Sequence, residues 1–173
     1  NKEHLFYKLG ADKNAPFLEE LHQAVNSVDS FEDKLKKYFE VMVHFYVANS
    51  TLWQIICFEM LGGTNGCRVE PDGDDFKVIP RYNSVKVSEE TSERILRYHK
   101  ILHDEYNILS QLIEQAMHDN LLKHDTVPEI TTKFVFFGVA MSIFNQSDDI
   151  AADMTDEEAA RIITDHFLRG NAR

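Results

Sequence analysis

Two histidines with a spacing suited to metal binding, His99 and His103, lie in a stretch of helical periodicity, and Asp104 and Glu105 follow directly. Residues four apart share one side of a helix, so two imidazoles at this spacing can bind one metal ion. The His-Glu-x-x-His motif of zinc proteases does not occur, and eight histidines in 173 residues produce such a pair by chance. We therefore assign no metal ligands, and we interpret one histidine as interior and the other as surface.

Motifs for catalysis are also lacking. The chain contains no glycine-rich phosphate loop, no nucleophile elbow and no Cys-x-x-Cys pair. Its two cysteines, Cys57 and Cys67, form no disulfide framework and are expected to be reduced thiols. The carboxylates between Asp148 and Glu158 are explained by solvation and by helix capping. We predict a protein that is not an enzyme, with no catalytic residues and no cofactor.

The overall charge and composition narrow the possible class of protein further. The 173 residues fit one domain, 43% of them are hydrophobic, and the formal net charge is −11. Nucleic-acid binding needs a concentrated basic surface, which this acidic chain does not offer. No signal peptide is visible, so we expect a cytoplasmic protein.

Apolar side chains recur at helical spacing through most of the chain. They predict helices over about 2–28, 31–48, 51–61, 88–120 and 155–170. Gly10 and Asn14-Ala15-Pro16 are expected to bend or interrupt the first of them. Ser30 and Ser88 are candidate N-caps, and Thr155-Asp-Glu-Glu158 forms a complete capping box. The fold class is therefore all-α.

The stretch from residue 62 to 88 departs from this periodicity. Val69, Phe76 and Val78 alternate on either side of Pro71-Asp-Gly73, which is typical of a small hairpin. A connection this long within a compact domain is often functional or mobile. Whether it covers a pocket or only extends from the domain is left open.

The segment from Thr126 to Asn145 is apolar almost all round. Its run from Phe134 to Phe144 is far shorter than the roughly 20 residues that a bilayer requires, so burial against a second chain is the better explanation. Gly138 and Ser142 on one face allow close helix approach. The bulky face is expected to point inward and comprises Phe134, Phe137 and Met141. A third face is left unassigned and comprises Phe136, Val139 and Ile143.

Four segments together resemble the TetR/AcrR family of bacterial transcriptional repressors. Leu112–Asp125 resembles the family's long helix and following turn, and Val127-Pro-Glu-Ile130 is similar to the start of the next helix. Thr155–Gly170 resembles the last helix. Asn1-Lys-Glu-His-Leu5 is similar to the end of the DNA-binding domain. The order and spacing of these segments carry the resemblance.

The resemblance implies a TetR-like C-terminal helical domain whose last two long helices form a dimeric four-helix bundle. Residues 1–9 would be the remnant of the DNA-binding domain and connecting helix, and residues 10–173 the ligand-binding and dimerisation domain. The helix-turn-helix would lie upstream of Asn1, so operator DNA would be bound through that missing part. The implied function is effector-responsive repression.

The site residues follow from the residue types and from the resemblance. Aromatic and methionine side chains with a few polar neighbours suit a pocket for an apolar or aromatic effector. We predict that the ligand is bound by Trp53, Cys57, Met60, His103, Tyr106, Phe137 and Met141. We place at the dimer interface Val135, Gly138, Ser142, Ile163 and Phe167.

Two other functions remain open on the sequence alone. One is a helical homodimerisation or protein-interaction module that binds no small molecule, for which these aromatic residues would be ordinary core. The other is a helical metal-dependent enzyme, which would use His99 and His103.

Overall fold

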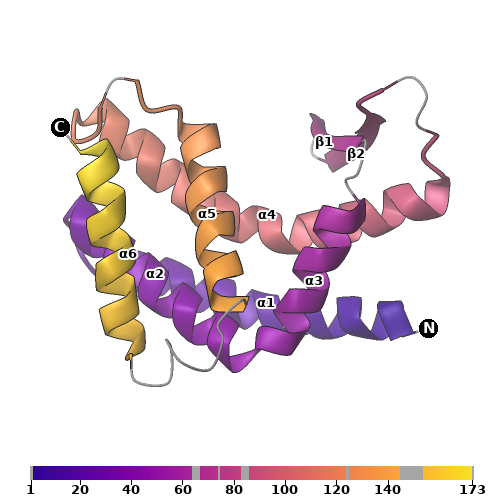
Figure 1. Ribbon diagram of the computed structural model, residues 1–173, viewed down its shortest axis with the longest axis horizontal. Coiled ribbons are helices and arrows are strands. Elements are labelled where there is room, and N and C mark those ends of the chain that lie inside the picture. Colours follow the sequence, from indigo (N-terminus) through magenta and orange to yellow (C-terminus); the bar gives the residue numbers. More distant parts are fainter. Residues whose placement is uncertain are drawn as a thin grey trace. The chain divides into compact units, whose positions relative to one another are not determined.

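The computed structural model describes residues 2–63, 67–73, 75–82, 86–123, 125–144 and 154–172 (Figure 1). Within these ranges the chain is helical apart from one antiparallel hairpin, which confirms the predicted fold class. The elements in order are α1 (Lys2–Asn26), α2 (Phe31–Ala48), α3 (Ser50–Gly63), β1 (Cys67–Asp72), β2 (Asp75–Pro80), α4 (Glu89–His118), α5 (Pro128–Phe144) and α6 (Asp156–Asn171).

The predicted caps begin their helices. The Ser30 hydroxyl accepts the backbone N–H of Asp33 at 3.1 Å, and Ser88 accepts that of Thr91 at 3.1 Å. At α6 both halves of the capping box are present, because Thr155 accepts from the Glu158 N–H while the Glu158 carboxylate accepts from the Thr155 N–H. These bonds pair N–H groups that the first helical turn leaves without partners.

Replacing Thr155 by alanine should therefore destabilise the protein modestly. Loss of an N-cap hydroxyl costs about 1 kcal/mol. In a protein of this size that corresponds to a melting temperature lower by about 2–4 °C. Thermal unfolding followed by circular dichroism measures the shift, and an unchanged melting temperature would contradict the role of the cap.

The expected interruption of the first helix is wrong. α1 runs unbroken from Lys2 to Asn26 with Pro16 inside it. Asn14 is buried, and its side-chain amide donates to the backbone oxygen of Ile101 at 3.0 Å. This contact between α1 and α4 supports the helix at the point where the sequence favours a break, and tertiary packing prevails over local propensity.

The chain divides into two compact units, Asn1–Asn14 with Thr51–Asp104, and Ala15–Ser50 with Glu105–Arg173. We call them the hairpin unit and the bundle unit. α1 and α4 each contribute a part to both. The predicted boundary after residue 9 does not coincide with the division between these units, and it stays a prediction.

In the hairpin unit, Gly10 allows α1 to approach α3 and α4 closely. A Cβ atom added to Gly10 would lie 2.8 Å from Cδ1 of Ile56 and 3.4 Å from Cδ1 of Ile101. Nearby, the ring of Tyr7 contacts Tyr98 edge-on, with centroids 6.5 Å apart, and the Arg97 guanidinium lies 5.6 Å from the Tyr7 centroid. The start of α1 is thus packed on α4.

The bundle unit contains the largest described core. α6 lies along α2, and α5 also contacts α2 (Figure 1). Its fully buried side chains include Leu21, Leu35, Tyr38, Phe39, Met42, Tyr46, Leu109, Ile113 and Phe136. None of the described helices combines the length and the hydropathy of a membrane span.

Candidate functional site

A buried carboxylate, Glu105, lies in the bundle unit where α4 packs on α2. Its side chain is 0% exposed. The hydroxyl of Tyr46 donates to its Oε2 at 2.5 Å, and the hydroxyl of Tyr38 donates to its backbone oxygen at 3.1 Å. Burial, and secondly the negative charge of Glu105, raise the pKa of Tyr38 well above its ordinary value of 10.0. The Tyr38 phenol therefore stays protonated and keeps donating at neutral pH.

Aromatic rings surround this carboxylate. The ring of Phe136 on α5 meets Tyr46 and Tyr106 edge-on, with centroids 6.5 and 6.4 Å apart. Phe137 packs against Phe136 at 5.4 Å. We call Tyr38, Tyr46, Glu105, Tyr106 and Phe136 the aromatic–carboxylate cluster. It is a polar group enclosed by rings, which is the composition of a small-molecule site.

The predicted ligand-binding residues are distributed over both units. Tyr106, Phe137 and Met141 belong to the bundle unit, where the first two contact the ring of Phe136. Trp53, fully buried on α3, and His103 belong to the hairpin unit. The side chains of Cys57 and Met60 lie outside the described residues. Ligand binding by this set stays a prediction.

Phe134 does not point inward, contrary to prediction. It is 77% exposed, while Phe136, Val139 and Ile143 on the previously unassigned face are buried. At 100° per residue, Phe134 is displaced by about 200° from Phe136 around the helix. The buried face is the one that meets α2 and α4. The bulky face that was expected to point inward therefore lies partly in solvent and partly at the edge of the core.

The predicted dimer-interface residues lie on two helices of the bundle unit. On α5, Gly138 and Ser142 are exposed and Val135 is half-buried. On α6, Ile163 is half-buried, whereas Phe167 is buried and contacts Phe31 at 6.4 Å. A role of these residues in dimerisation stays a prediction.

The hairpin is attached to α4 through its second strand. Cys67–Asp72 pairs antiparallel with Asp75–Pro80, and Gly73 in the connection has a φ of 67°, which suits glycine. The ring of Phe76 lies 4.7 Å from the His99 ring and 4.6 Å from the His103 ring. Within the described residues, no group of three or more histidine, cysteine, aspartate or glutamate side chains is placed to bind a metal.

An ion pair adds to this attachment. Lys100 Nζ lies 2.8 Å from Asp75 Oδ1, and this bond, followed by the backbone N–H of Phe76, lowers the pKa of Asp75. Because the folded pKa is lowered, the contribution to stability is complete above the ordinary value of 3.8 and is lost as pH falls through the folded value. Replacing Lys100 by methionine should raise the pKa of Asp75 toward 3.8. A carboxyl NMR titration measures it, and an unmoved pKa would refute the pairing.

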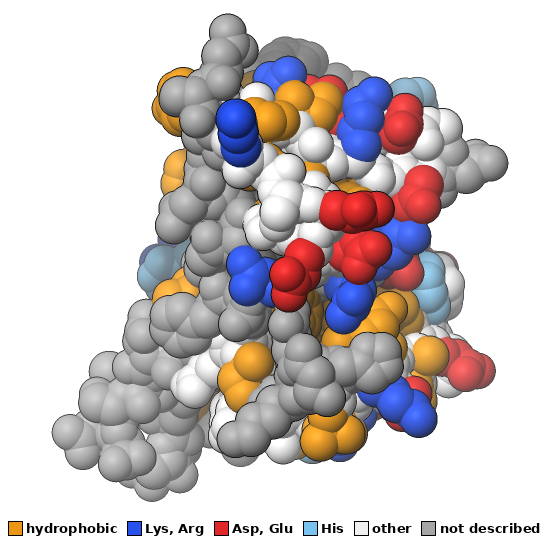
Figure 2. Space-filling model, turned by 90° about the vertical axis from the view of Figure 1, so that its right-hand side faces the viewer, with side chains coloured by type: hydrophobic (Ala, Val, Ile, Leu, Met, Phe, Trp, Pro, Cys, Tyr) orange, Lys and Arg blue, Asp and Glu red, His pale blue; other side chains and the backbone are white. Residues whose placement is uncertain are grey.

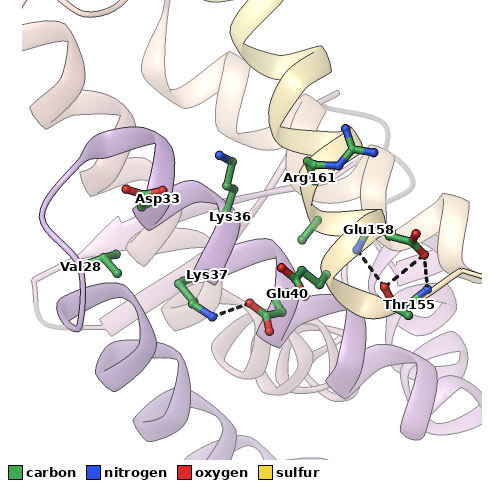
Figure 3. A pocket seen from close by; sticks show the side chains of 10 residues that line it. Val28, Asp33, Lys36, Lys37, Glu40, Thr155, Glu158 and Arg161 are labelled. Carbon is green, nitrogen blue, oxygen red and sulfur yellow. Dashed lines mark hydrogen bonds and ion pairs between the residues drawn. The ribbon is translucent and has the colours of Figure 1, made fainter.

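A groove of about 570 Å³ runs between α2 and α6 (Figure 3). Both lysines that line it form ion pairs: Lys37 lies 2.8 Å from Glu40, and Lys36 lies 2.6 Å from Glu32. On the face drawn in Figure 2, acidic and basic side chains are interspersed over the described surface. The described part of that face shows no basic surface suited to nucleic acid.

Three solved structures share this fold over nearly the whole chain. The TetR family transcriptional regulator PfmR from Thermus thermophilus matches 98% of this chain and 76% of its own, at 14% identity and a TM-score of 0.66. The ketosteroid transcriptional regulator KstR2 of Mycobacterium tuberculosis matches 100% and 74%, at 10% identity and 0.69. The fatty acid degradation regulator FadR from Bacillus halodurans matches 98% and 76%, at 15% identity and 0.66.

The chain thus has the fold of TetR family regulators, over about three quarters of such a protein. No protein-family model matches the sequence, and no curated protein sequence does. The resemblance seen in the sequence is confirmed at the level of fold.

Sequence reasoning missed Tyr38, Tyr46 and Phe136 as neighbours of a buried acid. From the sequence, Glu105 is only a carboxylate beside the histidine pair. Its one distinguishing signal is its position on the apolar side of α4, three residues after Leu102 and four before Leu109. His44 on α2 is exposed and lies 2.8 Å from Asp156.

Proposed function

We propose that this chain is the regulatory part of an effector-responsive transcriptional repressor of the TetR type. The shared fold carries this proposal. In the complete protein a helix-turn-helix preceding Asn1 would bind operator DNA. The acidic residues described here would then need no basic surface of their own. The chain would act in the bacterial cytoplasm as a regulator without catalytic activity.

The effector is a small apolar or aromatic molecule, bound by the predicted residues Trp53, Cys57, Met60, His103, Tyr106, Phe137 and Met141. The packing of Tyr106 and Phe137 against Phe136 supports this in the bundle unit. Two proteins of the same fold are named for ketosteroids and for fatty acid degradation, and both compound classes are largely apolar. An effector acts by binding one arrangement of the helices more tightly than another.

The protein is a homodimer paired through α5 and α6. Ile130 and Phe134 on α5 are 54% and 77% exposed, and Gly138 on the same side has open space around it. Large apolar side chains gathered on one exposed face indicate an interaction surface. The predicted residues Val135, Gly138, Ser142, Ile163 and Phe167 belong to this surface or support it.

Ligand binding can be tested with the one tryptophan of the chain, Trp53. We expect some members of a panel of hydrophobic compounds to change its fluorescence, to raise the melting temperature and to release the full-length protein from operator DNA. If the protein dimerises but no compound changes any of the three, it is a dimerisation module without a small-molecule ligand. Sedimentation at several concentrations establishes the dimer independently.

A further inference from the structure

The ends of α4 and α6 come together at one end of the bundle unit, where Leu122 and Ala172 form a bridge (Figure 1). With the start of α2 they line a groove of about 550 Å³, which we call the end groove. None of the predicted ligand-binding or dimer-interface residues lines it. The proposed function therefore leaves the end groove without a role.

The floor of the end groove is apolar. Ala116 is buried, and Phe31, Leu112 and Leu168 around it are half-buried. Leu121 lies at the rim and is 47% exposed. Covering apolar side chains that water still reaches is favourable, so this surface gains free energy when a complementary partner binds to it.

Backbone hydrogen bonds hold the walls of the end groove. Asn120 has a φ of 60°, which asparagine adopts more readily than most residues, and the Leu121 N–H after it donates to the Ala116 oxygen at 2.8 Å. The Lys123 N–H donates to the Asn171 oxygen at 2.8 Å and joins this turn to the end of α6. A partner therefore meets a groove that is already formed, and binding requires little further ordering.

The rim of the end groove is acidic. It carries the carboxylates of Asp29, Glu32 and Asp119, whereas Lys34 is the one basic side chain among the described lining residues. Glu32 is paired with Lys36 at 2.6 Å, but Asp29 forms no ion pair within the part of the chain that the structure describes. An apolar floor with an acidic rim is complementary to apolar side chains that are flanked by lysine or arginine.

Two other occupants fit the end groove less well. A second copy of this chain carries a net charge of −11, so the acidic rim would repel it. A small molecule is enclosed over most of its surface in a typical pocket. Half of the residues that line the end groove are exposed, so it does not enclose a small ligand in this way. A segment of another protein both covers an open groove and supplies the cations.

We propose that the end groove binds a helical segment of a second protein, in which an apolar stripe lies between lysine or arginine side chains. Laying the apolar face of a helix into a groove is a recurring mode of peptide recognition. This interaction goes beyond effector-responsive repression. It uses none of the predicted effector-binding residues, so either proposal can fail while the other stands.

Three synthetic peptides of about 15 residues, roughly four helical turns, serve as probes. The basic peptide has leucines on one helical face and lysines elsewhere, and the acidic peptide has glutamates in place of the lysines. The dispersed peptide has the composition of the basic one, with its leucines spread around the helix. Fluorescence anisotropy should show the basic peptide binding at least about tenfold more tightly than either of the others. Equal binding of the basic and dispersed peptides would overturn the proposal, because charge alone would explain it.

Leu121→Lys locates the binding surface. It removes an apolar side chain from the rim and adds a like charge, so it should weaken the basic peptide by at least about tenfold. Val47→Lys is the matched control, since Val47 on α2 is 48% exposed, lies outside the end groove and gives the same change in net charge. It should leave binding nearly unchanged. Equal losses in the two variants would show that the peptide does not bind in the end groove.

A second pair of variants covers a failure of Leu121→Lys to fold. Asp29→Lys inverts a charge at the rim and should weaken the basic peptide severalfold. Glu20→Lys inverts an exposed acid on α1 outside the end groove and should have little effect, and equal losses would again overturn the proposal. Sedimentation tests the other occupant. A dimer that Leu121→Lys dissociates and Val47→Lys does not would assign the end groove to a second copy of the chain, against the proposal.

Discussion

Replacing Phe136 by alanine should lower the free energy of unfolding by about 3–5 kcal/mol, the usual cost of removing a fully buried phenylalanine. Phe136 is 0% exposed and its ring contacts Tyr46, Tyr106 and Phe137. The loss combines the transfer free energy of the removed ring with the cavity that it leaves beside α2 and α4. Urea denaturation of both proteins measures the difference.

Phe134→Ala is the matched control, because it removes the same ring two residues away on the same helix. Phe134 is 77% exposed, so its replacement should leave the stability of the single chain almost unchanged. If Phe134 contributes to a dimer, its effect should grow with protein concentration, whereas that of Phe136→Ala should not. Equal losses for the two variants would contradict the orientation of α5.

Replacing Gly138 by leucine should weaken the proposed dimer by at least about a hundredfold, or about 3 kcal/mol. Within one chain an added Cβ meets open space, because beyond the adjoining part of α5 no atom of the described residues lies within 4 Å of it. Leucine is also a better helix former than glycine, so the chain should fold normally. A partner helix packed closely on Gly138 would meet the new side chain. Analytical ultracentrifugation measures the dissociation constant.

Gly170→Leu is the matched control for this substitution. Gly170 is also an exposed helical glycine with open space around an added Cβ, and it lies in the last turn of α6, beyond Phe167, the last of the predicted interface residues. Its replacement should weaken the dimer far less than Gly138→Leu. A dimer that tolerates leucine at Gly138 as well would overturn the assignment of this face.

The helices and the hairpin could be predicted because their signals are local. Thr155 and Glu158 are three residues apart and form the capping box, and the alternation of Val69, Phe76 and Val78 predicts the paired strands. The break expected near Pro16 does not occur, because this part of α1 is held by a distant contact: Asn14 donates to the backbone oxygen of Ile101, 87 residues away. Local patterns carry no information about such contacts.

The orientation of α5 and the position of Glu105 could not be predicted for a related reason. Phenylalanines occur at positions 134, 136, 137 and 144, so periodicity does not distinguish the buried face from the exposed one. The place of Glu105 between Leu102 and Leu109 on the apolar side of α4 indicates burial, but its donor Tyr46 lies 59 residues away and leaves no mark in the local sequence. Only the packing of α4 on α2 brings the two residues together.

The attachment of α6 at both ends has a mechanical consequence. At its start, His44 of α2 lies 2.8 Å from Asp156; at its end, the Lys123 N–H donates to the Asn171 oxygen at 2.8 Å, and Leu122 forms a bridge with Ala172. A rod fixed at both ends neither slides along its axis nor bends freely. α6 is therefore coupled to α2 at its start and to the turn after α4 at its end, and in the proposed dimer it would convey a displacement of either element to the second subunit.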